Sequence, residues 1–370
     1  MGTEDIKKQI KDIEDEIFNT QKNKATEHHI GKLKAKLARL REELEKRKSA
    51  GGKGKGFALK KQGDATVALI GFPSIGKSTL LNELTSAGSR VGSYDFTTLD
   101  AIPGMMKYKG AQIQIFDLPG LISGAADGKG RGREIISAVR NADLVLFMID
   151  SKHRNHLDLM HEELYKAGLR LNEKKPDVVI NKKGHGGIIV ATPLNLSNLD
   201  EELIKSIASE YITNAEIVIR EDITEDQLID VFVGNRSYIP AFVVINKIDL
   251  ISKEELSKKM KYISDAGWDV IAISALKKAG VDKLREKIFS KLSIIRIYMK
   301  PVGEQPDMNE PLILKKGDTI GDACKKLHRD FKRKFRYATV TGPSAKHDMQ
   351  KAGLDHKLKD QDILTIVISK

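Results

Sequence analysis

The chain has 370 residues, of which 40% are hydrophobic, a formal net charge of +12 and a single cysteine, Cys324. This length exceeds one ordinary domain, and one cysteine excludes both an intrachain disulfide framework and a cysteine-based zinc site. Its apolar runs are far shorter than the ~18 residues of a membrane span, and its first residues are charged, so we expect a cytoplasmic protein with no membrane partner.

The first 50 residues predict two helices joined by a turn. Apolar residues recur at helical spacing in two stripes, namely Ile6, Ile10, Ile13 and Ile17, then Ile30, Leu33, Leu37, Leu40 and Leu44. Each stripe is narrow, so we expect residues 1–50 to pair as a helical hairpin through a turn near 23–29. His28 and His29 fall in this turn, and two histidines alone make no metal site. Residues 51–62, rich in Gly and Lys, predict a flexible basic linker.

A phosphate-binding pattern follows a predicted buried strand at 68–70. The pattern G-x-x-x-x-G-K-[ST] is formed by Gly71, Phe72, Pro73, Ser74, Ile75, Gly76, Lys77 and Ser78, and Thr79 continues into a predicted helix. In this strand–loop–helix setting, backbone N–H groups can face a phosphate chain. We expect Lys77 to reach the β- and γ-phosphates and the Ser78 hydroxyl to ligate Mg²⁺.

A second element, D-x-x-G, follows the predicted strand at 113–116. The strand is expected to end in Asp117, which suits Mg²⁺ held through water, and the N–H of Gly120 is placed to meet the γ-phosphate. Five glycines crowd residues 120–132. Such a segment loses much entropy when it is ordered, so it suits a switch ordered by the γ-phosphate and released after hydrolysis.

A third element selects the base. Asn246, Lys247 and Asp249 form N-K-x-D after a predicted buried strand at 242–245. The Asp249 carboxylate can accept hydrogen bonds from guanine N1–H and N2–H, a donor pair that adenine lacks. Asn246 could hold the O6/N7 edge of the base. Backbone groups of a fourth element can complete the pocket, and this element consists of Ser274, Ala275 and Leu276.

A similar run, 181–184, lacks the carboxylate and is interpreted as a solvated basic turn. The four elements in this order predict a GTP-binding α/β domain with a mostly parallel sheet.

The distances between motifs indicate further domains. The segment between Asp150 and Asn246 is longer than one crossover helix needs. We therefore expect an α+β domain inserted at 172–238, which divides the GTPase domain into 63–171 and 239–292. The C-terminal residues 293–370 suggest a β-β-α-β-β order, typical of a ubiquitin-like β-grasp. Its predicted elements are strands at 294–298, 337–340 and 363–367 and a helix at 319–331.

Five segments resemble the developmentally regulated GTP-binding protein family of Obg-like GTPases. They are Thr20–Thr26, Gly71–Ser74, Phe96–Leu99, Asp117–Gly120 and Gly128–Arg133. The chain as a whole resembles the archaeal members of this family more closely. The resemblance implies a C-terminal TGS domain and an insertion similar to a domain of a ribosomal protein. It makes 96–99 the first switch, with Thr98, or alternatively Thr97, as a Mg²⁺ ligand in the GTP state. Thr341 stands where members usually carry Trp.

The resemblance implies hydrolysis of GTP to GDP and phosphate with Mg²⁺. Leu121 stands where Ras-like enzymes carry a water-orienting Gln, so we expect slow intrinsic turnover. Ser74 replaces the Asn of potassium-activated relatives, which leaves K⁺ stimulation open. Arg131 or Arg133 could act as an internal arginine finger. Eukaryotic members have a zinc-finger partner protein, which we would not assume for an archaeal chain.

Two clusters of cations suggest phosphate-rich partners. The first comprises Lys32, Lys34, Lys36, Arg39, Arg41, Lys46, Arg47 and Lys48, and the second comprises Lys325, Lys326, Arg329, Lys332, Arg333, Lys334 and Arg336. Either cluster alone could be a solvated helix face. Together they favour a ribosome- or RNA-associated switch in translation, and we separately expect a monomer. The alternative is an RNA-binding scaffold whose nucleotide site is largely structural.

Overall fold

The computed structural model describes residues 3–21, 23, 26–50, 61–85, 102–119, 132–150 and 156–369. The chain forms two compact units, one of Met1–Phe57 with Gly168–Tyr238 and one of Ala58–Ala167 with Ile239–Lys370. Within the described ranges, no helix is both long and apolar enough to cross a membrane.

The second unit is built on a six-stranded sheet in the order β11-β10-β4-β1-β3-β2. Its strands are β1 (Ala65–Gly71), β2 (Ile102–Tyr108), β3 (Ala111–Pro119), β4 (Leu144–Asp150), β10 (Ala241–Asn246) and β11 (Val270–Ala272). Only β2 runs antiparallel to its neighbour. The predicted mostly parallel α/β sheet is therefore confirmed. One detail differs, because β3 continues through Asp117 to Pro119 and does not end at the carboxylate.

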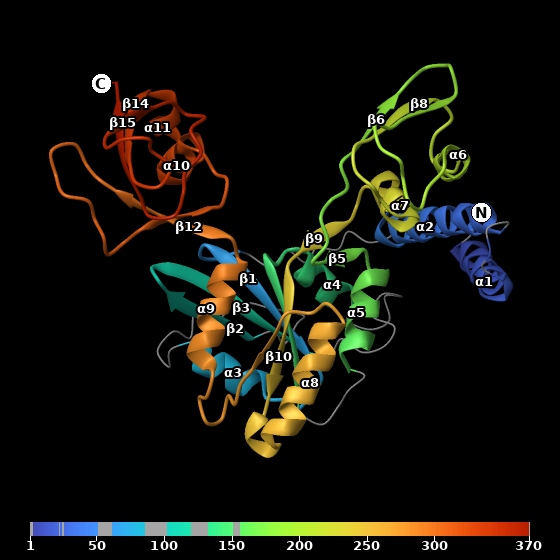
Figure 1. The fold of residues 1–370 in the computed structure, drawn as a ribbon, viewed down its shortest axis with the longest axis horizontal. Coiled ribbons are helices and arrows are strands. Elements are labelled where there is room, and N and C mark those ends of the chain that lie inside the picture. The colour runs from blue at the N-terminus through green and yellow to red at the C-terminus, as the bar shows by residue number, and fades with distance from the viewer. Residues whose placement is uncertain are drawn as a thin grey trace. The chain divides into compact units, whose positions relative to one another are not determined.

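Helices cover both faces of this sheet, as Figure 1 shows for α3 and α9 on one side and α5 and α8 on the other. The helices are α3 (Lys77–Leu84), α4 (Gly132–Arg140), α5 (His156–Lys166), α8 (Lys253–Asp265) and α9 (Val281–Lys291). Leu80 of α3 and Leu284 of α9 are fully buried in one cluster with Leu69 and Leu146 of the sheet. Strands β1, β4 and β10 are buried along their whole length because they lie at the centre of the sheet.

A five-stranded sheet, β13-β12-β16-β14-β15, forms the C-terminal part of the same unit. Its strands are β12 (Ile294–Met299), β13 (Leu312–Lys315), β14 (Phe335–Thr341), β15 (Gln350–Ala352) and β16 (Asp362–Ile368). The first and last strands pair in parallel and the other pairs are antiparallel, as in a β-grasp. The predicted single helix at 319–331 is wrong, because two helices form, α10 (Ile320–Leu327) and α11 (Arg329–Arg333). His328 separates them with extended backbone and caps α11.

Ion pairs connect the C-terminal part of this unit to the ends of the six-stranded sheet, and they come from one lysine of β13 and one of α10. Lys326 Nζ lies 2.8 Å from Asp64 Oδ1, and Lys315 Nζ lies 3.1 Å from Asp143 Oδ1. Both aspartates directly precede central strands. One of these cations, Lys326, belongs to the cluster that the sequence suggested for an RNA partner.

The first unit combines the N-terminal helices with the segment predicted as an insertion. Its helices are α1 (Thr3–Asn19), α2 (Glu27–Ala50), α6 (Glu201–Ser209) and α7 (Glu225–Val233). Its strands are β5 (Leu169–Leu171), β6 (Val178–Lys182), β7 (Ile188–Ala191), β8 (Ala215–Ile219) and β9 (Ser237–Ile239). Strand β8 is the centre of the sheet β6-β8-β7, and β5 pairs with β9. The run 181–184 begins in β6, and its side chains are exposed as expected.

Helix α2 lies between two apolar clusters. Leu33 and Leu40 pack with α1, which confirms the hairpin, whereas Ala35 is fully buried among residues of α6 and α7. The hydroxyl of Tyr211 donates to the Ala35 carbonyl at 2.8 Å. The predicted turn is shorter than expected, because His28 and its neighbour already belong to α2. His28 Nε2 lies 2.9 Å from Asp200 Oδ2 at the start of α6.

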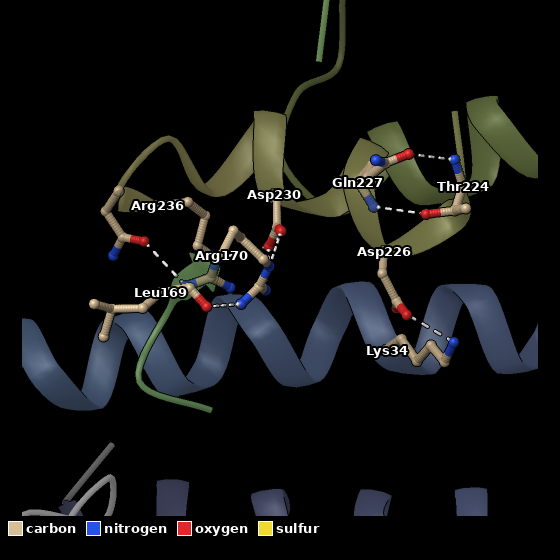
Figure 2. Close-up of polar contacts among 9 residues, drawn as sticks. Lys34, Leu169, Arg170, Thr224, Asp226, Gln227, Asp230 and Arg236 are labelled. Carbon is tan, nitrogen blue, oxygen red and sulfur yellow. Dashed lines mark hydrogen bonds and ion pairs between the residues drawn. The ribbon is translucent and has the colours of Figure 1, made fainter. Parts of the chain in front are cut away.

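A buried charge cluster joins α7 to the β5–β9 ribbon. Arg170 makes two hydrogen bonds to Asp230, of 2.5 and 2.8 Å, and Arg236 donates to the same carboxylate at 2.6 Å. Figure 2 shows both guanidinium groups converging on Asp230, and Lys34 of α2 reaching Asp226. Arg170 and Asp230 are each about 4% exposed, so this cluster is part of the core of the unit.

Candidate functional site

The loop between β1 and α3 is shaped by close backbone approaches. Gly76 has φ 93°, and a Cβ there would lie 2.6 Å from Nδ2 of Asn246. A Cβ at Gly71 would lie 2.5 Å from the carbonyl oxygen of Met148 in β4. Both positions therefore require glycine. Within the loop, Ile75 and Lys77 are buried, whereas the exposed residues are Pro73, Ser74, Ser78 and Thr79.

Lys77 turns its side chain back into the loop. Its Nζ donates to the carbonyl oxygens of Gly71 at 2.9 Å and Phe72 at 3.2 Å, and lies 3.9 Å from Asp117 Oδ1. Burial lowers the pKa of Lys77, and the charge of Asp117 opposes this shift. The ammonium is thus held beside the loop backbone, where phosphate oxygens could replace carbonyl oxygens as its partners.

Ser78 and Asp117 form a donor set for a hard cation. Ser78 Oγ donates to Asp117 Oδ2 at 3.3 Å, whereas Asp117 Oδ1 accepts no hydrogen bond among the described residues. Burial raises the pKa of Asp117, although Lys77 and Ser78 favour the charged form. A buried carboxylate oxygen without a donor, beside a hydroxyl, fits Mg²⁺, which binds oxygen ligands.

Asn246 joins three segments at the carboxyl end of β10. Its Nδ2 donates to the Ile75 carbonyl at 2.9 Å, and its Oδ1 accepts from the Ala275 N–H at 3.0 Å. The first contact links residues 171 positions apart in the chain. Both ends of this buried amide thus bond to protein, whereas the sequence suggested contact with the base. Asn246 therefore connects the loop Gly71–Ser78 to the segment that contains Ala275.

Asp249 lies in a short 3-10 helix, Ile248–Leu250, beside the segment that begins at Ser274. Ser274 Oγ donates to Asp249 Oδ1 at 2.6 Å, and this hydrogen bond lowers the pKa of Asp249. Lys247 has φ 61°, and its Nζ donates to the Ser74 carbonyl at 2.6 Å. The Leu276 side chain is 78% exposed. A charged carboxylate is thus presented near the loop, ready to accept two N–H groups.

One aromatic contact at this site was not predicted. The rings of Phe72 in the loop and His156 at the start of α5 stack, with centroids 3.8 Å apart and an interplanar angle of 23°. The two residues are far apart in the chain and no motif contains His156, so periodicity and spacing gave no signal for this pair.

Several predicted site residues lie outside the part of the chain that the structure describes. They are Thr97, Thr98, Gly120, Leu121 and Arg131, together with the side chain of Arg133. Their predicted roles stay predictions.

The two cationic clusters differ in how many charges are already paired. In the N-terminal cluster, Lys34, Arg39, Arg41, Lys46 and Arg47 all lie within ion-pair distance of acidic side chains. In the C-terminal cluster, Lys325, Lys326 and Arg333 are also paired. Within the described ranges no ion pair is made by Lys32 and Lys36 of the first cluster or by Lys332, Lys334 and Arg336 of the second. The C-terminal cluster is therefore the stronger candidate surface for a polyanion.

Three family models match consecutive parts of the chain from residue 66 to residue 368. A family model described as a 50S ribosome-binding GTPase matches residues 66–182, and a model of the C-terminal region of that domain matches 185–294. A TGS domain model matches 295–368. The Schizosaccharomyces pombe YchF GTPase structure has 15% identity and a TM-score of 0.47, covering 83% of this chain and 99% of that one.

Relatives match over nearly the full length. A GTP-binding protein of Methanocaldococcus jannaschii is 54% identical over 366 residues, which are 99% of this chain and 93% of the relative. Developmentally-regulated GTP-binding protein 2 of Homo sapiens is 46% identical over 365 residues, which are 98% of this chain and 99% of that protein. The chain therefore belongs to the developmentally regulated GTP-binding protein family and is a guanine-nucleotide-binding GTPase with a C-terminal TGS domain.

Proposed function

We propose that this GTPase hydrolyses GTP to GDP and phosphate with Mg²⁺, at a slow intrinsic rate, as a ribosome- or RNA-associated switch. The observation that carries the proposal is the convergence of Lys77, Asp117, Asn246 and Asp249 where β1, β3 and β10 approach their carboxyl ends. In parallel α/β sheets this edge is where ligands bind. We further propose that the chain acts as a monomer in the cytoplasm.

The phosphate chain would lie on the loop Gly71–Ser78. Loop N–H groups at the start of α3 would face this position, and the helix N-terminus favours negative charge. Lys77 would exchange its carbonyl partners for β- and γ-phosphate oxygens and stabilise charge that develops during transfer. Ser78 and Asp117 are the described residues that would hold Mg²⁺, which supplies further charge neutralisation when bound, and we propose Thr98 as an additional ligand.

Asp249 would recognise the guanine base. Its carboxylate would accept from N1–H and N2–H, and Ser274 keeps it oriented and charged. Adenine offers no equivalent donor pair, so it would leave the carboxylate unpaired. Backbone groups of Ala275 and Leu276 would complete the pocket, and the Lys247 stem would lie over the ring.

Two substitutions in the motifs suggest how turnover is controlled. Leu121 has no group that can orient the attacking water, so we propose that a partner or another residue accelerates hydrolysis. Ser74 has a shorter side chain than the Asn of potassium-activated relatives. Whether K⁺ accelerates hydrolysis is therefore measured by comparing GTP hydrolysis with and without K⁺. Gly120 is proposed to sense the γ-phosphate through its N–H.

The proposed RNA or ribosome partner is supported by charge. The chain carries a net charge of +12, which a single nucleotide site does not require. Three cations of the TGS domain, Lys332, Lys334 and Arg336, make no ion pair among the described residues, and the matched GTPase model is described as ribosome-binding. Salt-dependent binding to phosphate backbones follows from such a surface.

The experiment is single-turnover GTP hydrolysis with and without ribosomes at matched K⁺, combined with co-sedimentation in GDP and a GTP analogue. Faster hydrolysis with ribosomes, and binding that depends on the nucleotide, would support the switch. Unchanged hydrolysis and equal binding in both states would contradict it and support a scaffold with a structural nucleotide site.

A further inference from the structure

The phosphate loop has an aromatic neighbour that no motif contains. The imidazole of His156 stacks on the ring of Phe72, the second residue of the loop. The carbonyl of Phe72 accepts a hydrogen bond from Lys77 Nζ at 3.2 Å. A single residue, Phe72, therefore touches His156 through its ring and Lys77 through its backbone.

His156 stands on a well-anchored helix. Leu157, Met160 and Leu164 of α5 are buried. One turn further along, the ring of His161 packs edge-on against Trp268, with centroids 5.1 Å apart. Trp268 in turn packs edge-on against Phe147 of β4 at 5.5 Å. The helix is thus held against the sheet at several points, so that the imidazole at its first residue has a defined position.

The ring of Phe72 is also in contact with the core. It is partly buried against the cluster that contains Leu69 and Leu80, the residues on either side of the loop. Its ring is therefore restrained by core side chains and by the imidazole. Restraining this ring limits the conformations open to the Phe72 backbone, and hence to the carbonyl that holds Lys77.

We propose that His156 is a positioning residue for nucleotide binding, which acts by stacking on Phe72 and so pre-organising the phosphate loop around Lys77. This inference rests on the nucleotide site proposed above. A loop that is ordered before binding spares the nucleotide the entropy cost of ordering it. The benefit applies to GDP and GTP alike because both place phosphates on the same loop.

The test compares dissociation constants for GDP and a GTP analogue in the full chain. Stacked aromatic pairs contribute enough that His156→Ala should weaken both nucleotides by about twofold to tenfold. His156→Phe restores a ring without an imidazole and should bind within about twofold of the parent. In steady-state assays His156→Ala should raise KM and leave kcat unchanged, as expected when binding of ground and transition states is lost equally.

Glu162→Ala is the control on the same helix, because Glu162 is exposed, pairs with Lys166 and takes no part in the packing that anchors the helix. It should leave both dissociation constants unchanged. In a double-mutant cycle, adding His156→Ala to the Phe72→Ala variant should not change its dissociation constants further. Unfolding midpoints of each variant establish that the fold is retained.

Lys77→Ala separates failure of this inference from failure of the proposed site. If Lys77→Ala abolishes binding but His156→Ala does not weaken it, the positioning role is overturned and the site stands. Equal weakening in His156→Ala and His156→Phe, or in Glu162→Ala, would also overturn it. If Lys77→Ala binds nucleotide normally, the proposed site itself is wrong.

Discussion

The hydroxyl of Ser274 donates a hydrogen bond to Asp249, with 2.6 Å between Oγ and Oδ1. The same hydroxyl oxygen accepts from the N–H of Lys277 at 3.2 Å, so that its proton is directed at the carboxylate. A serine from the loop after β11 thus fixes the side chain that we assign to the base. Orientation and charge of Asp249 are both set before any ligand arrives.

Removing this hydroxyl should move the pH dependence of GTP binding. The hydrogen bond favours the charged carboxylate and lowers the pKa of Asp249, so Ser274→Ala should raise this pKa toward its ordinary value. The variant would then protonate, and lose GTP, at a higher pH than the parent as the solution is acidified. Dissociation constants measured by calorimetry from neutral pH down to about pH 4, near the ordinary pKa of an aspartate, test this. Ser290→Ala, on an exposed part of α9, is the control, and identical pH profiles for parent and Ser274→Ala would refute the assignment.

Asp117→Asn should separate stability from function. Burial raises the pKa of Asp117, so the charged carboxylate costs folding free energy at neutral pH, and this cost disappears as the pH falls through the raised pKa. The neutral amide avoids the cost. We expect a higher unfolding temperature for the nucleotide-free variant at pH 7, little difference in acid, and weaker Mg²⁺-dependent GTP binding. Thermal unfolding at two pH values, with and without Mg²⁺ and GTP, measures all three, and a less stable variant at pH 7 would contradict this account.

Asp230 should be critical for the first unit. Its carboxylate is shared by Arg170 and Arg236, and Asp230→Ala would leave buried guanidinium groups without their partner. Breaking a buried pair in this way costs about 3–5 kcal/mol. Hydrogen exchange should show loss of protection in α6, α7 and β8, whereas the six-stranded sheet keeps its protection and GTP binding is retained. Asp226→Ala, which removes a half-exposed ion pair with Lys34, is the control and should cost about 1 kcal/mol or less. Similar small losses for both variants would rule out a structural role for the cluster.

The two cationic clusters should behave differently in binding. Replacing Lys332, Lys334 and Arg336 by Ala should reduce ribosome affinity and flatten the plot of log affinity against log salt by about two to three units of slope. Replacing Arg39 and Arg41 should leave this slope unchanged, because these cations already pair with Glu210 and Glu14. Co-sedimentation across a salt series distinguishes the clusters. A larger change of slope for the N-terminal variant would contradict this assignment and place the partner on the N-terminal cluster.

The residues that we propose for the nucleotide site could be singled out from the sequence because their signals are local. A glycine-rich loop between an apolar strand and a helix, as in Gly71–Ser78, needs only short-range sequence. Strand β10, which ends at Asn246, is a continuous apolar run typical of a central parallel sheet. Strand β3, which carries Asp117, alternates Gln and Ile before Phe116, and the carboxylate follows directly. The order of the strands along the chain then brings the motifs to one edge.

What the sequence did not predict depends on pairs distant in the chain. Ala35 of α2 is buried among residues of α6 and α7, yet nothing near it marks it as part of their core. From the sequence alone Lys326 is indistinguishable from a solvated surface cation, but its side chain donates a hydrogen bond to Asp64, 262 positions away. The break at His328 also escaped prediction, since the apolar pattern from 319 to 331 continues through it. Such contacts are selected by tertiary packing, which composition and periodicity do not reveal.

Calorimetric titration of the parent chain and Asp249→Asn with GTP, ATP and XTP in Mg²⁺ tests the central assignment most directly. Asparagine offers a carbonyl and an amide in place of two acceptor oxygens, so the variant should lose GTP and gain XTP, whose ring presents a carbonyl where guanine has its amino group. The parent should bind GTP and reject ATP. Equal binding of GTP and ATP by the folded parent, or unchanged preference for GTP in Asp249→Asn, would contradict the account.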